Sequence, residues 1–275
     1  MVIKPGTHTL RIRYWVKDVA TQIEGTITKI IPSHTFAKNE YVNMEADLQI
    51  KNYDGDHYYM WDAQEQYWKG HEWNLGGSQP TLMTQSASSD YPQNSSDPNH
   101  RYYHEGGGSG RFDATQGCAG LPNVNEMTWY AVKGEPRWDG DELWTTMGHL
   151  YKGGMWFKKK SVLKAENNYD TEKSYDRLTD LRTTWKNYNN SSVSSDLPSV
   201  ANAGNYFYLP TLGWYYSNYI SHSCQLLGIG SNVGYWSSSA DPSNNLQACS
   251  LSFSSVGVLV QVNSRHDGFR VGTFE

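Results

Sequence analysis

Three cysteines, Cys118, Cys224 and Cys249, have the greatest chemical potential in this chain of 275 residues. A nucleophilic or redox-active cysteine needs a neighbouring base, a second thiol or a bound metal. No Cys-x-x-Cys pair and no Cys/His cluster surrounds any of the three. Because the number is odd, at least one cysteine cannot pair within the chain. The sequence therefore predicts neither a zinc site nor a complete disulfide framework.

Other residues that could do chemistry lack the partners that this chemistry needs. The glycine-rich stretch 106–110 is not followed by a Lys-Ser/Thr pair at P-loop spacing. Asp54-Gly55-Asp56 is better interpreted as a turn, because calcium takes several more oxygen ligands. The histidines that show no ligand spacing are His34, His57, His71, His104 and His149. We therefore expect no catalytic residue, no metal, no cofactor and no enzymatic activity.

The composition is typical of a recognition protein and not of a nucleic-acid-binding one. The formal net charge is −5, from 23 Lys+Arg and 28 Asp+Glu, so the basic footprint of a nucleic-acid partner is missing. Tyr (20) and Trp (11) are frequent, whereas charged residues make up only 19%. Tyrosine offers a large contact area at a low entropic cost. A loop-rich fold that simply packs many aromatic rings would have the same composition.

No segment of the sequence is expected to insert into a membrane. No apolar run approaches the length of about 18 residues that spans a bilayer. The start, MVIKPGTHTLRIR, lacks the apolar core of a signal peptide. The chain is therefore either cytosolic or a fragment of a longer protein, and its composition favours the fragment.

Residues 7–50 alternate between apolar and polar side chains. Leu10, Ile12 and Tyr14 would share one face of a strand, with Arg11 and Arg13 on the other. The pattern predicts three or four antiparallel strands, too few for an independent sandwich. We therefore expect residues 1–50 to be a remnant or part of a β-sandwich, and residues 51–275 to form a separate domain.

Two or three helices are expected in the middle of the chain, after a long loop over residues 86–110. The predicted helices span residues 123–134, 139–153 and 175–185. Asn123 is a good N-cap for the first, and Asp139 or Asp141 for the second. Short strands and loops are expected beyond the Ser/Asn-rich linker 187–195.

The C-terminal segment, residues 248–274, shows the strictest alternation in the sequence, with a hairpin followed by a last strand at Phe269 and Val271. The side chains expected to point inward are Leu251, Phe253, Val258, Val260 and Val262, and those expected to point outward are Ser250, Ser252, Ser254, Leu259, Gln261 and Asn263. A turn at Ser255-Val256-Gly257 would join the two strands. Because the period is two, the outward side chains are free to vary without disturbing the core.

The outward side chains are chemically mixed and almost uncharged, and Ser264, His266 and Asp267 extend them. An ordinary solvated strand face carries Lys, Glu and Thr, which discourage edge pairing. Hydroxyls, amides and a single leucine are more typical of a ligand-binding surface. The alternative is a plain serine-rich face without a binding function.

The second half of the chain resembles the closing half of C-type-lectin-fold domains. The motifs are Tyr206-Phe207-Tyr208-Leu209-Pro210, Gly234-Tyr235-Trp236-Ser237-Ser238-Ser239 and Gly268-Phe269-Arg270-Val271. The resemblance is closest to variable proteins of diversity-generating retroelements and to the Fibrobacter succinogenes major paralogous domain, which also occurs in surface proteins of gut Bacteroidales. It covers residues 50–275 well and the first 50 weakly.

The resemblance implies an α+β fold: a C-type lectin fold of antiparallel strands, helices and long loops, preceded by a few strands of a fimbrillin-like β-sandwich. It also implies a surface adhesin whose outward positions are diversified by a retroelement. The positions that match are Gln247, Cys249, Ser252, Ser254, Leu259, Gln261, Asn263, Ser264, His266 and Asp267, followed by Asn232, Val233, Tyr235 and Asp241. Trp236 and Arg265 are expected to be scaffold residues.

Two activities found among C-type-lectin-fold proteins are not expected. Formylglycine generation needs a reactive cysteine pair or metal-bound thiols, and Cys249 has no such partner. Calcium-dependent sugar binding relies on Glu-Pro-Asn or Gln-Pro-Asp, followed by Trp-Asn-Asp. Glu135-Pro136-Arg137 breaks the first pattern and Trp236-Ser237-Ser238 the second. Serine hydroxyls are poor substitutes for carboxylate and amide ligands of calcium.

The expected partner is a protein or glycan receptor on another cell or surface, together with pilus subunits, and not a nucleic acid. The expected location is the cell surface, in a pilus or at the outer membrane, or else a phage particle. The alternatives are a non-diversified structural pilus or surface subunit and a phage tail receptor-binding protein.

Overall fold

The computed structural model describes residues 2–43, 47–218, 220–272 and 274–275. Strands hold 37% of the chain and helices 8%. The strands are β1 (Gly6–Lys17), β2 (Glu24–Phe36), β3 (Lys51–Asn52), β4 (Tyr58–Tyr59), β5 (Arg137–Thr146), β6 (His149–Lys158), β7 (Tyr188–Asn190), β8 (Tyr206–Pro210), β9 (Trp214–Asn218), β10 (Ser223–Leu227), β11 (Asn232–Ala240), β12 (Gln247–Ser254), β13 (Gly257–Ser264) and β14 (Phe269–Arg270). The helices are α1 (Val124–Lys133) and α2 (Lys160–Ala165), with 3₁₀ turns η1 (Trp73–Leu75) and η2 (Ala203–Asn205).

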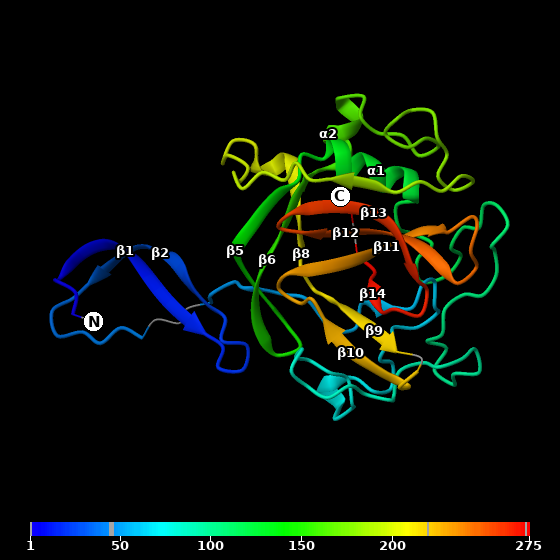
Figure 1. The fold of residues 1–275 in the computed structure, drawn as a ribbon. Helices are drawn as coiled ribbons and strands as arrows, with labels where there is room; N and C mark the ends of the chain where they lie inside the picture. Colours follow the sequence, from blue (N-terminus) through cyan, green and yellow to red (C-terminus); the bar gives the residue numbers. More distant parts are fainter. Residues whose placement is uncertain (1, 44–46, 219, 273) are drawn as a thin grey trace.

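The expected α+β C-type lectin fold is wrong, because this is a β-rich, sandwich-like structure. One sheet has six strands in the order β4-β14-β11-β12-β13-β7, and another has four in the order β3-β5-β6-β8. The ribbons β1–β2 and β9–β10 form two further sheets (Figure 1). Most pairs are antiparallel, and β11–β14 and β3–β5 are parallel.

The β1–β2 ribbon lies beside the main body, and its alternation is as predicted (Figure 1). It holds two strands and not the predicted three or four, because the described residues of 37–50 form no strand. The turn between β1 and β2 contacts the main body at the β5–β6 turn. There Asp18 accepts a hydrogen bond from the backbone N–H of Leu150 at 2.8 Å, and Thr21 donates to the Leu150 carbonyl at 2.9 Å.

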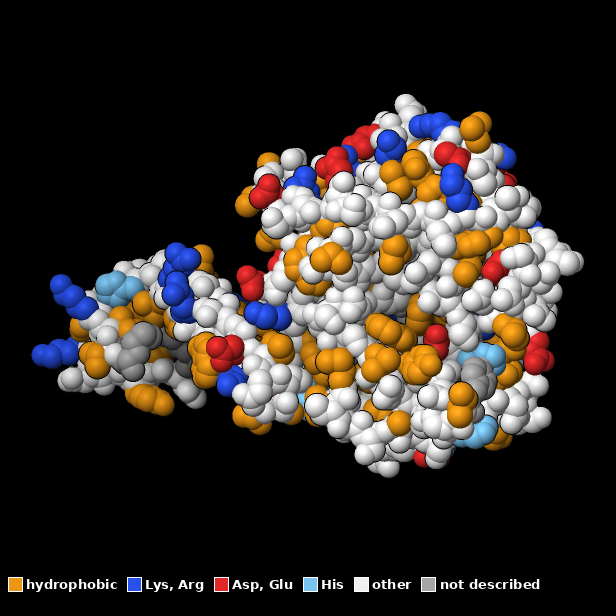
Figure 2. All heavy atoms as spheres, viewed as in Figure 1, with side chains coloured by type: hydrophobic (Ala, Val, Ile, Leu, Met, Phe, Trp, Pro, Cys, Tyr) orange, Lys and Arg blue, Asp and Glu red, His pale blue; other side chains and the backbone are white. Residues whose placement is uncertain are grey.

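The main hydrophobic core lies on the inner side of the six-stranded sheet. Leu251, Phe253, Val258 and Val260 from this sheet pack with residues of the four-stranded sheet and of α1. In Figure 1, α1 and α2 lie together beyond β13, at one end of the body. Lysine and arginine side chains gather near these helices and on the β1–β2 ribbon (Figure 2).

A second, smaller cluster covers part of the outer side of the same sheet. It contains Trp61, Trp236, Ala248 and Phe269, with Trp236 and Phe269 stacked at a centroid distance of 4.5 Å. The cluster lies over β11, β14 and the start of β12. Farther along the outer side of the β12–β13 hairpin, Ser252, Ser254, Gln261 and Asn263 are half-buried and Leu259 is exposed.

Helix α1 is the predicted helix that the structure confirms. The Asn123 side chain accepts a hydrogen bond from the Glu126 backbone, and the Glu126 carboxylate accepts one from the Asn123 N–H, a capping box. None of the helices formed by the described residues has both the length and the apolar character needed to cross a bilayer.

The helix predicted over residues 139–153 is wrong, because this segment is the β5–β6 hairpin. Met147 and Gly148 have φ values of 48° and 79°, as a two-residue hairpin turn requires. Trp144 stacks on Tyr151 across the hairpin at 5.3 Å. The spacing of large apolar residues fitted a helix, but turn geometry and cross-strand packing favour strands.

The helix predicted over residues 175–185 is also wrong, because this segment is an irregular loop. Arg177 has a φ of 62°, which interrupts a right-handed helix. The Asp176 carboxylate accepts hydrogen bonds from the backbone N–H groups of Leu178 and Thr179, both at 2.9 Å. An aspartate that bonds the backbone just after it stabilises a turn in preference to a helix.

Candidate functional site

The β12–β13 hairpin orients its side chains as the alternation predicts. Cross-strand partners share a side of a sheet, and the register pairs Leu251 with Val260 and Ser252 with Leu259. Leu251 and Val260 are fully buried, whereas Leu259 is 36% exposed. The hairpin face is defined here as the outer row Ser252, Ser254, Leu259, Gln261 and Asn263.

Two amides and two serines form a hydrogen-bonded ladder on this side of the hairpin. The Gln261 side chain donates to the Ser252 hydroxyl at 3.3 Å, and the Asn263 side chain donates to the Ser250 hydroxyl at 2.8 Å. Ser250 itself is buried. Each amide carries a second N–H and a carbonyl oxygen. The ladder therefore fixes the side chains and presents donors and acceptors to an approaching ligand.

Strands on both sides extend the hairpin face with further uncharged side chains. Asn232, at the start of β11, pairs with Ser254 and is exposed. Asn189, in β7, pairs with Leu259 and is also exposed. The sequence did not predict Asn189, because β7 lies in an Asn/Ser-rich segment without periodicity. The result is an uncharged surface across four neighbouring strands, β11, β12, β13 and β7.

Four residues expected to face solvent are buried instead. Cys249, Val233, Tyr235 and Asp241 are 0%, 2%, 2% and 3% exposed. Cys249, Val233 and Tyr235 occupy the inner row, where Val233 pairs with Phe253 and Tyr235 with Leu251. Alternation along β11 and β12 places them in the core.

Asp241 is buried for a different reason, because its carboxylate is satisfied within its own turn. Both the backbone N–H and the hydroxyl of Ser243 donate to Asp241 Oδ1 at 2.8 Å. This turn connects β11 to β12. We therefore assign Asp241 to the scaffold of the hairpin.

Gln247 and Ser264 lie at the open end of the hairpin and are half-buried. They pair with each other, and the register places them on the inner side, in the same row as Leu251 and Val260. The expectation that they belong to the outer face is therefore wrong. They remain partly accessible because the inner row ends there.

His266 and Asp267, also expected at the surface, are 8% and 9% exposed. The ring of His266 lies against Tyr102 and Tyr103, and its Nε2 is 2.9 Å from the Tyr102 hydroxyl. The backbone N–H of Ser217 donates to Asp267 Oδ1 at 3.4 Å. Both residues follow the last residue of β13, so strand alternation no longer sets their direction.

Burial moves the two neighbouring pKa values in opposite directions. It lowers the pKa of His266 to about 4 and raises the pKa of Asp267 to about 7. Between pH 4 and 6.5 the folded protein holds a neutral histidine and a protonated aspartate. The unfolded chain holds the reverse, a charged histidine and an ionised aspartate. Because both states bind one proton in total, the pair gives no net slope of stability against pH in this range.

Asp267→Asn is expected to reveal the hidden pH dependence of His266. In the variant the unfolded state binds more protons than the folded state between pH 4 and 6.5. Its stability relative to wild type should therefore rise with pH, by up to about 1.4 kcal/mol per pH unit. Urea unfolding at several pH values in this range measures the difference.

The reciprocal variant His266→Gln is the matched control for this measurement. Only Asp267 then titrates, the folded state binds more protons, and relative stability should fall as pH rises from 4 to 7. If the free energy of unfolding of both variants changed with pH in the same way as that of wild type, the two side chains would not be desolvated as the structure indicates.

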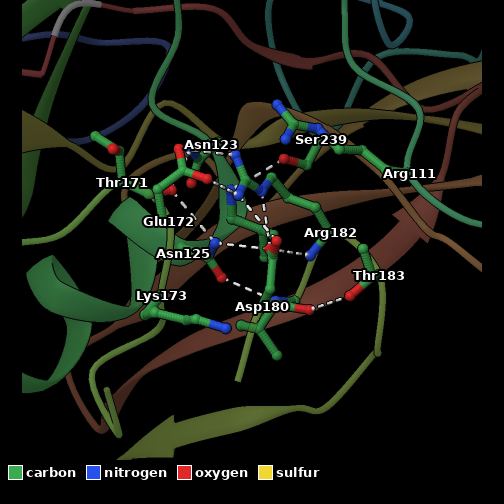
Figure 3. Close-up of polar contacts among 12 residues, drawn as sticks. Arg111, Asn123, Asn125, Thr171, Glu172, Lys173, Asp180, Arg182, Thr183 and Ser239 are labelled. Atoms are coloured by element: carbon green, nitrogen blue, oxygen red, sulfur yellow. Dashed lines mark hydrogen bonds and ion pairs between the residues drawn. The ribbon is translucent and has the colours of Figure 1, made fainter. Parts of the chain in front are cut away.

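A polar network holds the segment before β7 against α1 and so supports the edge of the site (Figure 3). Asn125 donates to Asp180 Oδ1 at 2.9 Å, and Arg182 contacts both Asp180 and Glu172. Burial opposes the ionisation of Asp180, but hydrogen bonds from Arg182 and Asn125 lower its pKa to about 2. The network therefore remains ionised at neutral pH and fixes the path of the chain towards β7.

The cysteines are free and buried, and burial raises the pKa of all three thiols. A thiol that stays protonated is a poor nucleophile. Among the described residues, one group could offer a metal three ligand atoms, which lie within 4.8 Å of one another: Asp54, Asp56 and His57, all exposed. Asp56 and His57 already contact each other at 2.5 Å.

The hairpin face is thus an uncharged surface of hydroxyls, amides and one leucine. It can offer hydrogen bonds and one apolar contact to a partner. A scan against protein-family models, a search of curated proteins and a search of solved structures each gave no match to this chain.

Proposed function

We propose that this protein is a surface-displayed binding protein, an adhesin that engages a protein or glycan receptor through the hairpin face. The observation that supports the proposal most is the register of β12 and β13. It separates a buried inner row from an outer row that carries hydroxyls, amides and Leu259. A face built in this way can change its specificity without changing the core.

The same separation supports a second part of the proposal, that a retroelement diversifies the outer positions. The encoding DNA should then contain a nearby, near-identical repeat of the codons for β12 to β14, differing at template adenines, beside a reverse transcriptase gene. A locus without such a repeat would contradict diversification and favour a non-diversified surface subunit.

Replacing Leu259, Gln261 and Asn263 together with serine is expected to abolish receptor binding while leaving the fold intact. The three positions lie in the outer row and not in the core, and loss of the two amide–serine hydrogen bonds should cost only about 1 kcal/mol each. Binding of the fluorescently labelled protein to epithelial and bacterial cells can be measured by flow cytometry, and stability by thermal unfolding.

Val260→Ala is the matched control, since it changes the inner row of the same strand. It should cost about 2 kcal/mol of stability and retain binding at temperatures where the protein is folded. Retained binding by the triple variant, or its unfolding, would contradict the proposal.

A further inference from the structure

A large cleft lies apart from the hairpin face, and its volume is about 840 Å³. Its walls come from the four-stranded sheet, from β11 and β14, and from the residues that follow β14. No residue of the hairpin face lines it. Clefts of about 300–1,000 Å³ are typical of small-molecule sites.

Aromatic rings form much of the wall. The cleft is lined by Tyr53, Trp144, Trp156 and Tyr208. The rings of Tyr53 and Trp144 lie edge to face with centroids 6.2 Å apart, and those of Trp156 and Tyr208 are tilted with centroids 5.1 Å apart. The face of an aromatic ring is electron-rich and attracts weakly positive C–H groups. A ligand with a flat C–H face would therefore pack well here.

The charged groups of the wall nearly balance. The described lining carries the carboxylates Asp54, Glu126, Glu142 and Glu275 and the cations Lys51, Lys160 and Arg270. Lys160 pairs with Glu126 at 3.1 Å, and Lys51 lies over the ring of Tyr53 at 4.6 Å. The balance favours a neutral ligand. The carboxylates accept hydrogen bonds and the cations donate them. A ligand hydroxyl can both donate and accept, so it can bond to either kind of group on this wall.

Three buried polar atoms of residues that line the cleft have no hydrogen-bond partner among the described residues: the Tyr130 and Tyr208 hydroxyls and Arg270 Nε. Arg270 is 5% exposed, and its Nη1 donates to the Asp54 carbonyl at 2.8 Å. Buried polar groups nearly always have a partner, so unpaired ones require an explanation. A hydroxylated ligand that enters the cleft would supply hydrogen-bond partners for these atoms of the wall.

We propose that the cleft binds a neutral saccharide, with a sugar ring packed on the aromatic wall and hydroxyls bonded to the carboxylates and cations. A pyranose combines a C–H face with a rim of hydroxyls, and the wall offers partners for both. The site is separate from the hairpin face, and the proposal does not depend on the function of that face.

An array of neutral oligosaccharides built from hexoses, pentoses and N-acetylhexosamines tests the proposal, with the strongest binder measured by calorimetry. Tyr53→Ala removes a ring and should raise Kd about tenfold. Tyr208→Phe removes only a hydroxyl and should raise Kd about fivefold. The triple hairpin-face variant should bind the saccharide like wild type.

Lys51→Ala is a further variant for the case that Tyr53→Ala fails to fold, because Lys51 is exposed and also lines the cleft. It should likewise weaken binding. The proposal is overturned if no neutral oligosaccharide binds, or if only acidic glycans do. It is also overturned if the hairpin-face variant loses saccharide binding while the cleft variants keep it, a result that would leave the adhesin proposal standing.

Discussion

Replacement of Arg265 with methionine is expected to lower the free energy of unfolding by about 3–5 kcal/mol. Arg265 is fully buried, and its Nε donates to the Gln247 carbonyl at 3.0 Å. Its Nη1 donates to the carbonyls of His104 and Gly106 at 3.0 and 2.9 Å. The guanidinium lies 4.4 Å from the ring centroid of Trp61. Methionine fills much of this volume but removes the guanidinium donor from the carbonyls of His104 and Gly106, whereas the Gln247 carbonyl keeps the backbone N–H of Asp241. Urea unfolding measures the loss.

Arg265→Lys separates the charge of the side chain from its geometry. Burial lowers the pKa of Arg265 to about 10, so the side chain is still charged at neutral pH. A lysine keeps this charge but cannot present the planar fork that reaches carbonyls on different segments. We expect it to be destabilising too, whereas Arg11→Met on the exposed face of β1 should change stability by less than about 0.5 kcal/mol. If the lysine variant were as stable as wild type, charge alone would account for the role of Arg265.

The features that could be predicted from sequence are those whose causes lie close together in the chain. The hairpin face follows from strict alternation around Val260 and Leu259, and a tight turn keeps the two strands in register. Helix α1 follows from Asn123 and Glu126, which cap each other across three positions. The expected scaffold roles of Trp236 and Arg265 agree with their full burial.

The errors arose where spacing alone does not distinguish a strand from a helix. The apolar residues between 139 and 153 fit the period of a helix as well as that of a strand. Only the positive φ values of Met147 and Gly148 select the hairpin. The α+β expectation came from the resemblance to C-type-lectin-fold domains, and this helix and the one expected over 175–185 agreed with it. With both replaced by strands or loop, the fold is dominated by β-structure.

The segment 51–120 could not be predicted, because its order comes from distant residues. Tyr59 in β4 pairs with Phe269 in β14, and Lys51 in β3 pairs with Trp144 in β5. Aromatic residues of the segment that are fully buried are Tyr58, Trp61, Tyr67 and Trp68. Much of the aromatic content that suggested a recognition surface is therefore core.

His266 and Asp267 show the same limit at the candidate site. The alternation ends with β13 at Ser264, so it does not predict the direction of the side chains that follow. Tyr102 and Tyr103, from the long loop, cover His266. Asp62, which lies forty positions earlier in the chain, contacts this loop at His104 and also bonds the backbone just after it, at residues 115–118.

Asp62→Asn is expected to destabilise the protein by about 3 kcal/mol and to loosen the loop that covers His266. The buried Asp62 carboxylate accepts hydrogen bonds from the backbone N–H groups of Thr115, Gln116 and Cys118 at 2.8, 2.8 and 3.0 Å. The His104 Nδ1 lies 2.8 Å from Asp62 Oδ2. Asparagine replaces one acceptor oxygen with an NH₂ group, which faces donors it cannot bond.

Asparagine is the appropriate replacement because Asp62 has a φ of 53°, a conformation that Asn tolerates well. The variant therefore tests the carboxylate and not the backbone. Asp113→Asn, on the same loop but with its side chain 40% exposed, is the matched control and should cost less than about 1 kcal/mol. Limited proteolysis should cut the Asp62 variant within residues 86–120 faster than the control. Equal stability and equal cleavage of the two variants would show that contacts other than the Asp62 carboxylate order this loop. The burial of His266 could then not be explained by Asp62.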